Sequence, residues 1–311
     1  MIDTLNFRIP QPDRKHILQI FAKKAKEGQV TYYPNENKAI EATFKNYKFR
    51  LTDHYLTGYG SLSKLFNNNN LFSLSFFQIQ DAIAILEKFF EMPLDDAEII
   101  RMDFACSIEV NEQVNQYIDL FASPTGYKMR VFESESTYFE SSKETLFFYD
   151  KTKELIAKPQ NINNNFKDKN ILRYELRITK NIPKALGWED AKLENLHNYH
   201  YYMDILKRYL KSYKSLPVHT TPLPSQLMYK DLKDFKNSLI IEGIRSMGGT
   251  ENITYAIKQA KMKKETKFKI RKFIHQLPAG QIISSELKNE LDDKILSYCK
   301  KEAYSAFMWS D

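Results

Sequence analysis

Three segments in the first 180 residues alternate apolar and polar side chains with a period of two. They read "IIRMDFACS" at 99–107, "TLFFYDK" at 145–151 and "LRYELRI" at 172–178. This period is typical of a β-strand with one buried face, because successive side chains point to opposite sides of a sheet. A chain that carries these segments is therefore constrained to contain a sheet with one apolar face and one polar face.

The rest of the pattern adds helices around that sheet. Apolar residues recur at helical spacing over 12–28 and 75–93, whereas 38–51 alternates and predicts a strand or hairpin. Beyond residue 186 the period is helical, with a proline-rich connector at 217–226. The sequence predicts an α+β fold with a central, mostly antiparallel sheet flanked by helices, divided into residues 1–186 and a helical C-terminal region at 187–311.

The charge balance points to an anionic partner. The 311 residues carry a net charge of +7 with a pI near 9, and nucleic acid is the commonest polyanion bound by basic proteins. Cys106 and Cys299 lie far apart without ligand spacing, which argues against a zinc site and for a reducing compartment. With no recognisable secretory signal or membrane-spanning stretch, we expect a cytoplasmic protein with no membrane partner.

Counting alternate positions places charged and hydroxyl groups on the polar faces of the three strands. Those faces hold Arg101, Asp103, Ala105 and Ser107; Thr145, Phe147, Tyr149 and Lys151; and Arg173, Glu175 and Arg177. Carboxylates suit Mg²⁺ or Mn²⁺, which can polarise a phosphodiester oxygen. A phenol with a pKa near ~10 needs a nearby cation or metal to attack at neutral pH, and Lys151 is placed to assist. Taken singly, each residue also fits a structural role. Asp103 and Glu175 could belong to a ladder of surface ion pairs, and Tyr149 could be an ordinary half-buried tyrosine of the sheet.

In their order along the chain, these segments resemble the gene II/X family of filamentous-phage and plasmid rolling-circle replication initiation proteins. The resemblance rests on "IIRMDFACS", "ETLFFYDKTKE" and "ILRYELRITKNIPKALGW". It extends to "MIDTLNFRI" at the start and "GSLSKLFNNNNL" at 60–71, so it covers about residues 1–190. The chain is more distantly similar to the Rep-trans initiators and to the HUH fold.

The resemblance implies a site-specific, metal-dependent endonuclease whose tyrosine nicks one DNA strand and stays bound to its 5′ phosphate. On that basis Tyr149 is the nucleophile, Lys151 assists it, and Asp103 and Glu175 hold Mg²⁺ or Mn²⁺. Origin DNA is the expected partner, single-stranded or supercoiled, with a host helicase and polymerase as further partners in a bacterial cell. The arginines of the same strands, Arg101, Arg173 and Arg177, are expected to contact that DNA.

The resemblance is incomplete at one point, because the histidine pair that names the HUH class is absent near these strands. The third metal ligand therefore stays open among Glu41, Asp53, His54 and Glu109. The sequence also leaves open whether a second tyrosine, Tyr138 or Tyr174, shares the work of Tyr149.

A basic run lies near the end of the chain. Within 256–273 the cations include Lys263, Lys264, Lys267, Lys269 and Arg271, and only Glu265 opposes them. Such a run is either a solvated helix face or an element that contacts phosphates. The longer stretch 240–277 is also compatible with a helix-turn-helix-like DNA-binding element.

These observations lead to one hypothesis and two alternatives. The hypothesis is a rolling-circle initiator that nicks and transfers a DNA strand through a covalent 5′-phosphotyrosine at Tyr149. The first alternative is a DNA-binding regulator without catalysis, whose function lies in 240–277. The second is a metal-dependent nuclease that uses water, with Tyr149 in a structural role.

Overall fold

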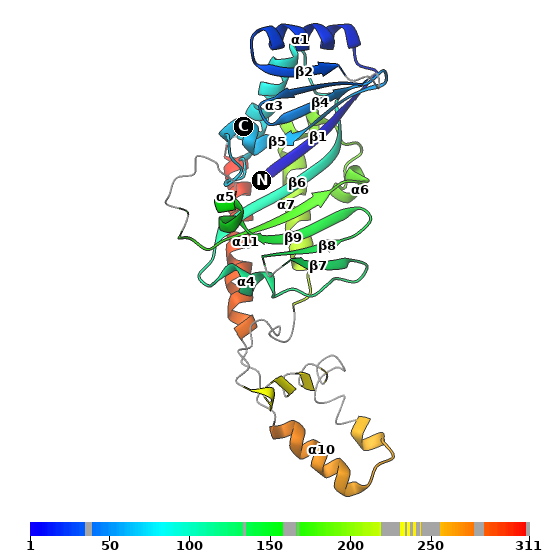
Figure 1. The fold of residues 1–311 in the computed structure, drawn as a ribbon, viewed down its shortest axis with the longest axis vertical. Coiled ribbons are helices and arrows are strands. Elements are labelled where there is room, and N and C mark those ends of the chain that lie inside the picture. The colour runs from blue at the N-terminus through cyan, green and yellow to red at the C-terminus, as the bar shows by residue number, and fades with distance from the viewer. Residues whose placement is uncertain are drawn as a thin grey trace.

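The fold is built on a single large antiparallel sheet (Figure 1). The computed structural model describes residues 1–34, 39–132, 135–157, 166, 168–218, 231–233, 235, 236, 239, 240, 243, 256–276 and 283–308. Within these ranges helices and strands are both abundant, and the strands gather in one sheet. The predicted α+β class is confirmed.

The sheet has ten strands in the order β2-β3-β4-β5-β1-β6-β10-β9-β8-β7, and every neighbouring pair is antiparallel. The strands are β1 (Ile2–Pro10), β2 (Val30–Pro34), β3 (Ile40–Phe44), β4 (Tyr47–Leu51), β5 (Tyr55–Ser61), β6 (Glu98–Glu109), β7 (Lys128–Phe132), β8 (Ser136–Glu140), β9 (Glu144–Asp150) and β10 (Ile171–Ile178). The three alternating segments of the sequence become β6, β10 and β9, which lie side by side at the centre and toward one edge.

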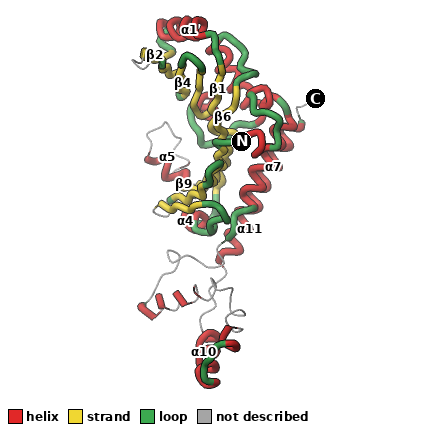
Figure 2. The backbone as a smooth tube through the Cα atoms, turned by 90° about the vertical axis from the view of Figure 1, so that its right-hand side faces the viewer, coloured by secondary structure: helices red, strands yellow, loops and turns green. Residues whose placement is uncertain are grey.

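The helices are α1 (Arg14–Lys26), α2 (Leu62–Asn67), α3 (Phe76–Phe90), α4 (Val114–Ile118), α5 (Lys151–Ala157), α6 (Ile182–Leu186), α7 (Tyr199–Lys214), α10 (Lys264–Gln276) and α11 (Ile283–Phe307). The predicted start of α3 is confirmed, because Ser75 and Gln78 form a capping box there. Figure 2 shows α7 and α11 on one side of the sheet and α5 on the other. None of the described helices is both long and apolar enough to cross a membrane.

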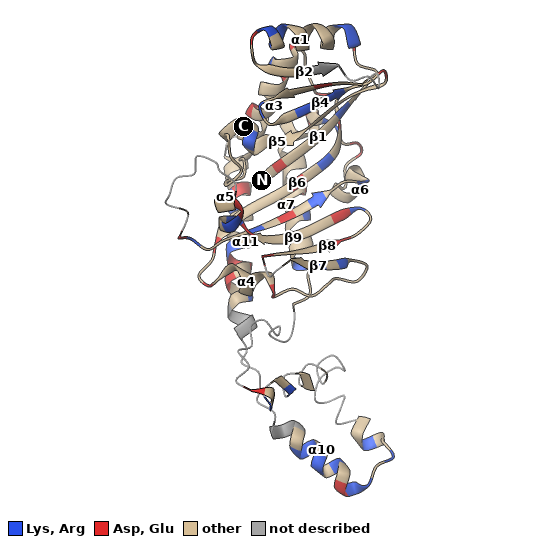
Figure 3. Cartoon of the chain, viewed as in Figure 1, with Lys and Arg blue, Asp and Glu red and all other residues tan. Residues whose placement is uncertain are grey.

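The two faces of the sheet differ as the alternation predicts. Met102, Phe104 and Cys106 of β6 are fully buried in the hydrophobic core, as are Leu172 and Tyr174 of β10. The intervening side chains of both strands point the other way. We call that second side the open face; it carries Asp103 on β6, Glu175 on β10 and Tyr149 on β9, and its charged residues are visible in Figure 3.

The core beneath the sheet includes the end of the chain. Leu287, Leu291 and Ile295 of α11 belong to the same buried cluster as the strands. α11 contacts α7, α3, α4 and β6. The predicted division at residue 186 stays a prediction, but helices from beyond it pack directly on the sheet.

The basic run of the sequence continues from residue 264 onward as α10, which lies apart from the sheet in Figure 1. Lys263, Lys264 and Lys269 are exposed, and Lys269 pairs with Glu265 at 3.0 Å. Of the predicted helix-turn-helix-like stretch 240–277, the residues 241, 242, 244–255 and 277 lie outside the described residues. That motif therefore stays a prediction, while the basic helix within it is present.

Candidate functional site

The open face of β6, β10 and β9 brings Asp103, Tyr149 and Glu175 into one pocket. Arg177 of β10 lies opposite Asp103 of β6, and Arg173 of β10 lies opposite Tyr149 of β9. The pocket has a volume of about 500 Å³ and its lining includes Asp3, Arg101, Asp103, Tyr149, Glu175 and Arg177. Strand order and register thus assemble groups that lie as far apart in the sequence as Asp3 and Arg177.

Asp103 is held by two arginines at the wall of this pocket. Arg101 Nε donates to one carboxylate oxygen at 2.8 Å, and Arg177 Nε donates to the other at 3.0 Å. The hydrogen bond to Asp103 raises the pKa of Arg101, so this guanidinium stays charged at any ordinary pH. The side chains of both arginines are about one-third exposed, at 30% and 32%, whereas Asp103 is at 2%. The two guanidinium groups therefore present positive charge at the pocket surface.

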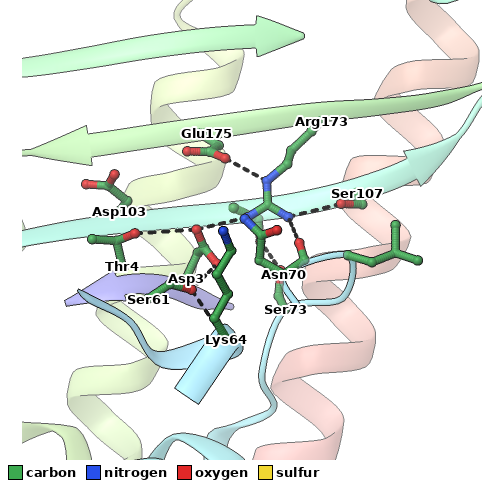
Figure 4. A network of polar contacts seen from close by, with 12 residues as sticks. Asp3, Thr4, Ser61, Lys64, Asn70, Ser73, Asp103, Ser107, Arg173 and Glu175 are labelled. Atoms are coloured by element: carbon green, nitrogen blue, oxygen red, sulfur yellow. Dashed lines mark hydrogen bonds and ion pairs between the residues drawn. The ribbon is translucent and has the colours of Figure 1, made fainter. Parts of the chain in front are cut away.

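Arg173 is the buried centre of the site, with no exposed side-chain surface. Its Nε donates to Glu175 at 2.6 Å and its Nη1 donates to the Asn70 carbonyl at 2.7 Å. Nη2 lies 3.2 Å from the Asp3 carboxylate (Figure 4). Because Arg173 is enclosed by these partners, the prediction that it contacts DNA does not fit its position; it organises the carboxylates instead.

Asp3 is a site residue that the sequence analysis missed. Counting from the buried Leu5 and Phe7, strict alternation would point Asp3 into the core. The pairing of β1 with β6 shifts register between Ile2 and Thr4, which is the mark of a β-bulge. The extra residue turns Asp3 to the open face, where it accepts a hydrogen bond from Ser61 Oγ at 3.0 Å.

Tyr149 donates the hydrogen of its hydroxyl to Glu175 Oε1 at 2.8 Å. Burial raises the pKa of Tyr149 well above its ordinary value, and the positive charge of Arg173 only partly opposes this. Burial also raises the pKa of Glu175, again against the effect of Arg173. The phenol therefore stays protonated at neutral pH, in direct contact with a carboxylate that can accept its proton.

Lys151 lies under Tyr149 rather than beside its hydroxyl. The predicted strand ends one residue earlier, at Asp150, because the Asp150 carboxylate accepts from the Lys153 amide at 2.9 Å and so caps helix α5. Lys151 is fully buried, with Nζ 3.0 Å from Asn70 Oδ1 and 5.8 Å from the centre of the Tyr149 ring. Desolvation lowers the pKa of Lys151 to about 8, and the charge of Arg173 adds to that effect.

The pocket offers the oxygen donors that a hard divalent cation prefers. Asp3, Asp103 and Glu175 all line it, and Mg²⁺ is commonly held by one or two carboxylates, with waters and substrate phosphates completing its shell. Across the described ranges no group of three or more His, Cys, Asp or Glu side chains is arranged to hold a metal ion. Among the described residues the pocket thus supplies carboxylates of suitable chemistry but no ready set of three ligands, so an ion bound here would need further ligands from outside the protein.

The other predicted candidates lie away from the pocket lining. Asp53 pairs with Arg14, Glu109 pairs with Lys169, and His54 and Glu41 are exposed. Of the two alternative tyrosines, Tyr138 lines the pocket, whereas Tyr174 is buried in the core on the opposite face.

The comparisons with known proteins identify the family of the chain. A family model that describes the N-terminal part of the phage gene II replication-associated protein matches residues 1–204, about two thirds of the chain. Among curated proteins no sequence matches. The matched range includes all ten strands and every residue that lines the pocket. The chain therefore belongs to the gene II family of phage rolling-circle replication proteins, a family of DNA-binding replication initiators.

Proposed function

We propose that this chain starts rolling-circle replication by nicking one DNA strand with Tyr149 as the nucleophile. The observation that carries the proposal is the hydrogen bond of 2.8 Å from the Tyr149 hydroxyl to Glu175, inside a pocket with exposed arginines at its wall. A nucleophile in contact with a base, which another group orients in turn, is the arrangement that covalent catalysis requires. Arg173 is the orienting group, through its bond of 2.6 Å to Glu175.

The reaction exchanges one phosphodiester for another. The Tyr149 oxygen forms a bond to the scissile phosphorus, and the bond from phosphorus to the 3′ oxygen breaks. Glu175 takes the phenolic proton, and water protonates the departing 3′ oxygen, which leaves a free 3′-hydroxyl to prime synthesis. The 5′ phosphate stays on Tyr149, so the strand can be rejoined later without a nucleotide cofactor.

Arg101 and Arg177 are the groups that we expect to bind the scissile phosphate. Each is about one-third exposed at the pocket and is already held in place by Asp103. Guanidinium groups bind phosphate oxygens in a bidentate manner, and they need not reorganise as charge develops in the transition state. This role replaces the broader expectation that all three arginines of these strands contact DNA.

Asp103 and Glu175 would hold Mg²⁺ or Mn²⁺, with the ion taking the place of an arginine contact at Asp103, and the bound ion would supply positive charge to a phosphate oxygen. Beyond residue 186, we propose that α10 contributes DNA affinity through its exposed lysines. The two parts would divide the work, with chemistry on the sheet and part of the binding in the helical C-terminal region.

The test is denaturing electrophoresis of the protein with single-stranded DNA from its own replication origin and Mn²⁺. We expect a covalent protein–DNA adduct from the wild type and none from Tyr149→Phe, which removes one oxygen atom and keeps the ring. Tyr138→Phe, a variant of the neighbouring tyrosine in the same pocket, is the matched control and should still form the adduct. Cleavage without adduct would indicate a water-using nuclease, and binding without cleavage a regulator.

A further inference from the structure

Aromatic rings form a row on the open face that leads away from Tyr149 across β9, β8 and β7. The ring of Phe147 is stacked with that of Tyr149 at 6.1 Å and with that of Tyr138 at 5.0 Å, and the ring planes differ by only 14° and 10°. Phe132 meets Tyr138 edge-on at 5.5 Å. We call Phe132, Tyr138 and Phe147 the aromatic row.

The row becomes more exposed with distance from the nucleophile. Phe147 is 4% exposed, Tyr138 is partly exposed, and Phe132 on the edge strand is 51% exposed. A single exposed phenylalanine is ordinary in a soluble protein. Here, however, the exposed ring ends a continuous series that starts at the proposed nucleophile, and Tyr138 lines the same pocket as Tyr149.

Cations accompany the row. The Arg177 guanidinium carbon lies 5.0 Å from the centre of the Phe147 ring. On the edge strand, Arg130 lies opposite Tyr138 and is exposed, and its Nε donates to Glu140 at 2.7 Å. Aromatic rings flanked by cations are the combination with which proteins bind single-stranded nucleic acid, because bases stack on the rings while the cations neutralise phosphates.

The position of Tyr149 favours an unpaired strand over a duplex. Its hydroxyl is bonded to Glu175, which is only 5% exposed, so a phosphorus atom must enter the pocket to within ~3–3.5 Å of that oxygen to react. Phe132 and Tyr149 both lie in register with Ser136, one on each side of it. They are thus two strands apart, or ~10 Å at the usual strand spacing, which is close enough for nucleotides next to the scissile phosphate.

We propose that Phe132 and Tyr138, the exposed end of the aromatic row, form a stacking platform for unpaired bases next to the scissile phosphate, with Phe147 supporting Tyr138 from below. The proposal rests on the proposed function for its location, and it adds to that function a subsite that binds bases beside the nucleophile. Stacking on a ring is tolerant of sequence, because every base has a π-face. The platform would therefore hold the strand without choosing the nick site.

The test measures binding in a Tyr149→Phe parent, so that no covalent step contributes. The probe is a short oligo(dT) strand with one 2-aminopurine, a fluorescent base whose emission changes when it stacks. We expect Phe132→Ala and Tyr138→Ala each to weaken binding by ~5- to 150-fold, the range for loss of one base–aromatic stack, and to abolish the change in emission. Tyr138→Phe keeps the ring and should behave as the parent.

Tyr304→Ala is the matched control, because it removes a ring that is 65% exposed on α11, a helix that packs on the core side of the sheet. Phe132 is also more than half exposed, so its loss leaves the core intact. Unchanged affinity in both alanine variants, or an equal loss for a blunt duplex of the same length, would overturn the proposal. If the wild type forms no adduct but the emission still responds to the row, the nicking hypothesis fails and the platform stands.

Discussion

At the scale of single residues, the Tyr149 hydroxyl and the Glu175 carboxylate share one hydrogen bond, and burial raises the pKa of both groups. A raised phenol pKa means that almost no phenolate exists at neutral pH. A raised carboxyl pKa makes Glu175 a stronger base than an ordinary glutamate. Under the proposed mechanism, the attack by Tyr149 depends on proton transfer within this contact rather than on prior ionisation of the phenol.

Glu175→Gln should slow adduct formation by ~10²- to 10⁴-fold, the usual contribution of a general base. In the wild type the rate should fall as the pH drops through the raised pKa of Glu175, because the protonated carboxyl cannot accept the phenolic proton. The glutamine variant should lose this fall in rate at low pH, the acid limb of the profile. The measurement is the single-turnover rate of adduct formation against pH, and Glu135→Gln, a change of another carboxylate that lines the pocket, should keep both rate and limb. An unaltered acid limb in Glu175→Gln would assign the proton to another acceptor.

Lys151 connects the site to the stability of the fold. Its pKa falls from 10.5 in the unfolded chain to about 8 in the fold, mainly by desolvation. Below pH 8 it is charged in both states, and burial of that charge costs up to about 3 kcal/mol. Between pH 8 and 10.5 the unfolded chain binds more protons, so this cost disappears as the pH rises.

Lys151→Met should therefore remove one pH-dependent contribution to the free energy of unfolding. The free energy of unfolding of the wild type, relative to this variant, should rise by up to about 3 kcal/mol from pH 8 to pH 10.5. Urea unfolding at a series of pH values measures it. Lys26→Met, at an exposed position of α1, provides the control and should run parallel to the wild type. If the free energy of unfolding of Lys151→Met ran parallel to that of the wild type across this pH range, the lysine would not be desolvated in solution.

At the scale of strands and helices, alternation in the sequence predicted which side chains of β6, β10 and β9 share a face. Alternation gave the wrong face at two positions where the strand backbone is irregular. The β-bulge in β1 turns Asp3 to the open face, and the cap by Asp150 ends β9 before Lys151. The buried role of Arg173 was also beyond prediction, because it depends on the Asn70 carbonyl, which only the tertiary fold brings near.

Two glycines of β5 have a purpose that the sequence did not reveal. A Cβ on Gly60 would lie 2.4 Å from the ring of Tyr47, which is fully buried and bonded to the Leu5 carbonyl at 3.1 Å. Gly58 stands in the same relation to Phe7, at 2.5 Å. The core rings thus lie flat against β5, next to the strand that carries Asp3.

Gly60→Ala should destabilise the fold by about 1–3 kcal/mol, the usual cost of overpacking a core. Thermal unfolding measures the change. Lys48→Ala on the neighbouring strand, whose side chain is exposed, should shift the midpoint little. A stable Gly60→Ala variant would show that Tyr47 can move away from β5.

At the scale of the whole molecule, α10 carries a series of basic side chains apart from the sheet (Figure 3). Charge removal at Lys263, Lys264, Lys267 and Lys269 should weaken DNA binding. It should also flatten the slope of log affinity against log salt by up to ~0.9 for each duplex phosphate that the variant no longer neutralises. Adduct formation at saturating DNA should persist, because the pocket is untouched.

A second variant separates local contact from net charge. Alanine at the exposed lysines Lys15, Lys26, Lys211 and Lys214, on α1 and α7, changes the total charge by the same amount. If both quadruple variants flatten the slope equally, α10 acts only through the overall field of the protein. A larger effect at α10 would identify it as a contact surface.

The packing of α11 sets how the basic helix is connected. α7 ends at Lys214 and α11 begins at Ile283, and both helices belong to one core. The chain between them leaves this body and returns to it, so α10 is an insertion tethered at both ends rather than a domain appended to a tail. An element tethered at both ends stays at high effective concentration near the pocket, even when its own contacts with DNA dissociate quickly. On the proposed function, this connection keeps the basic helix beside the pocket from one strand exchange to the next.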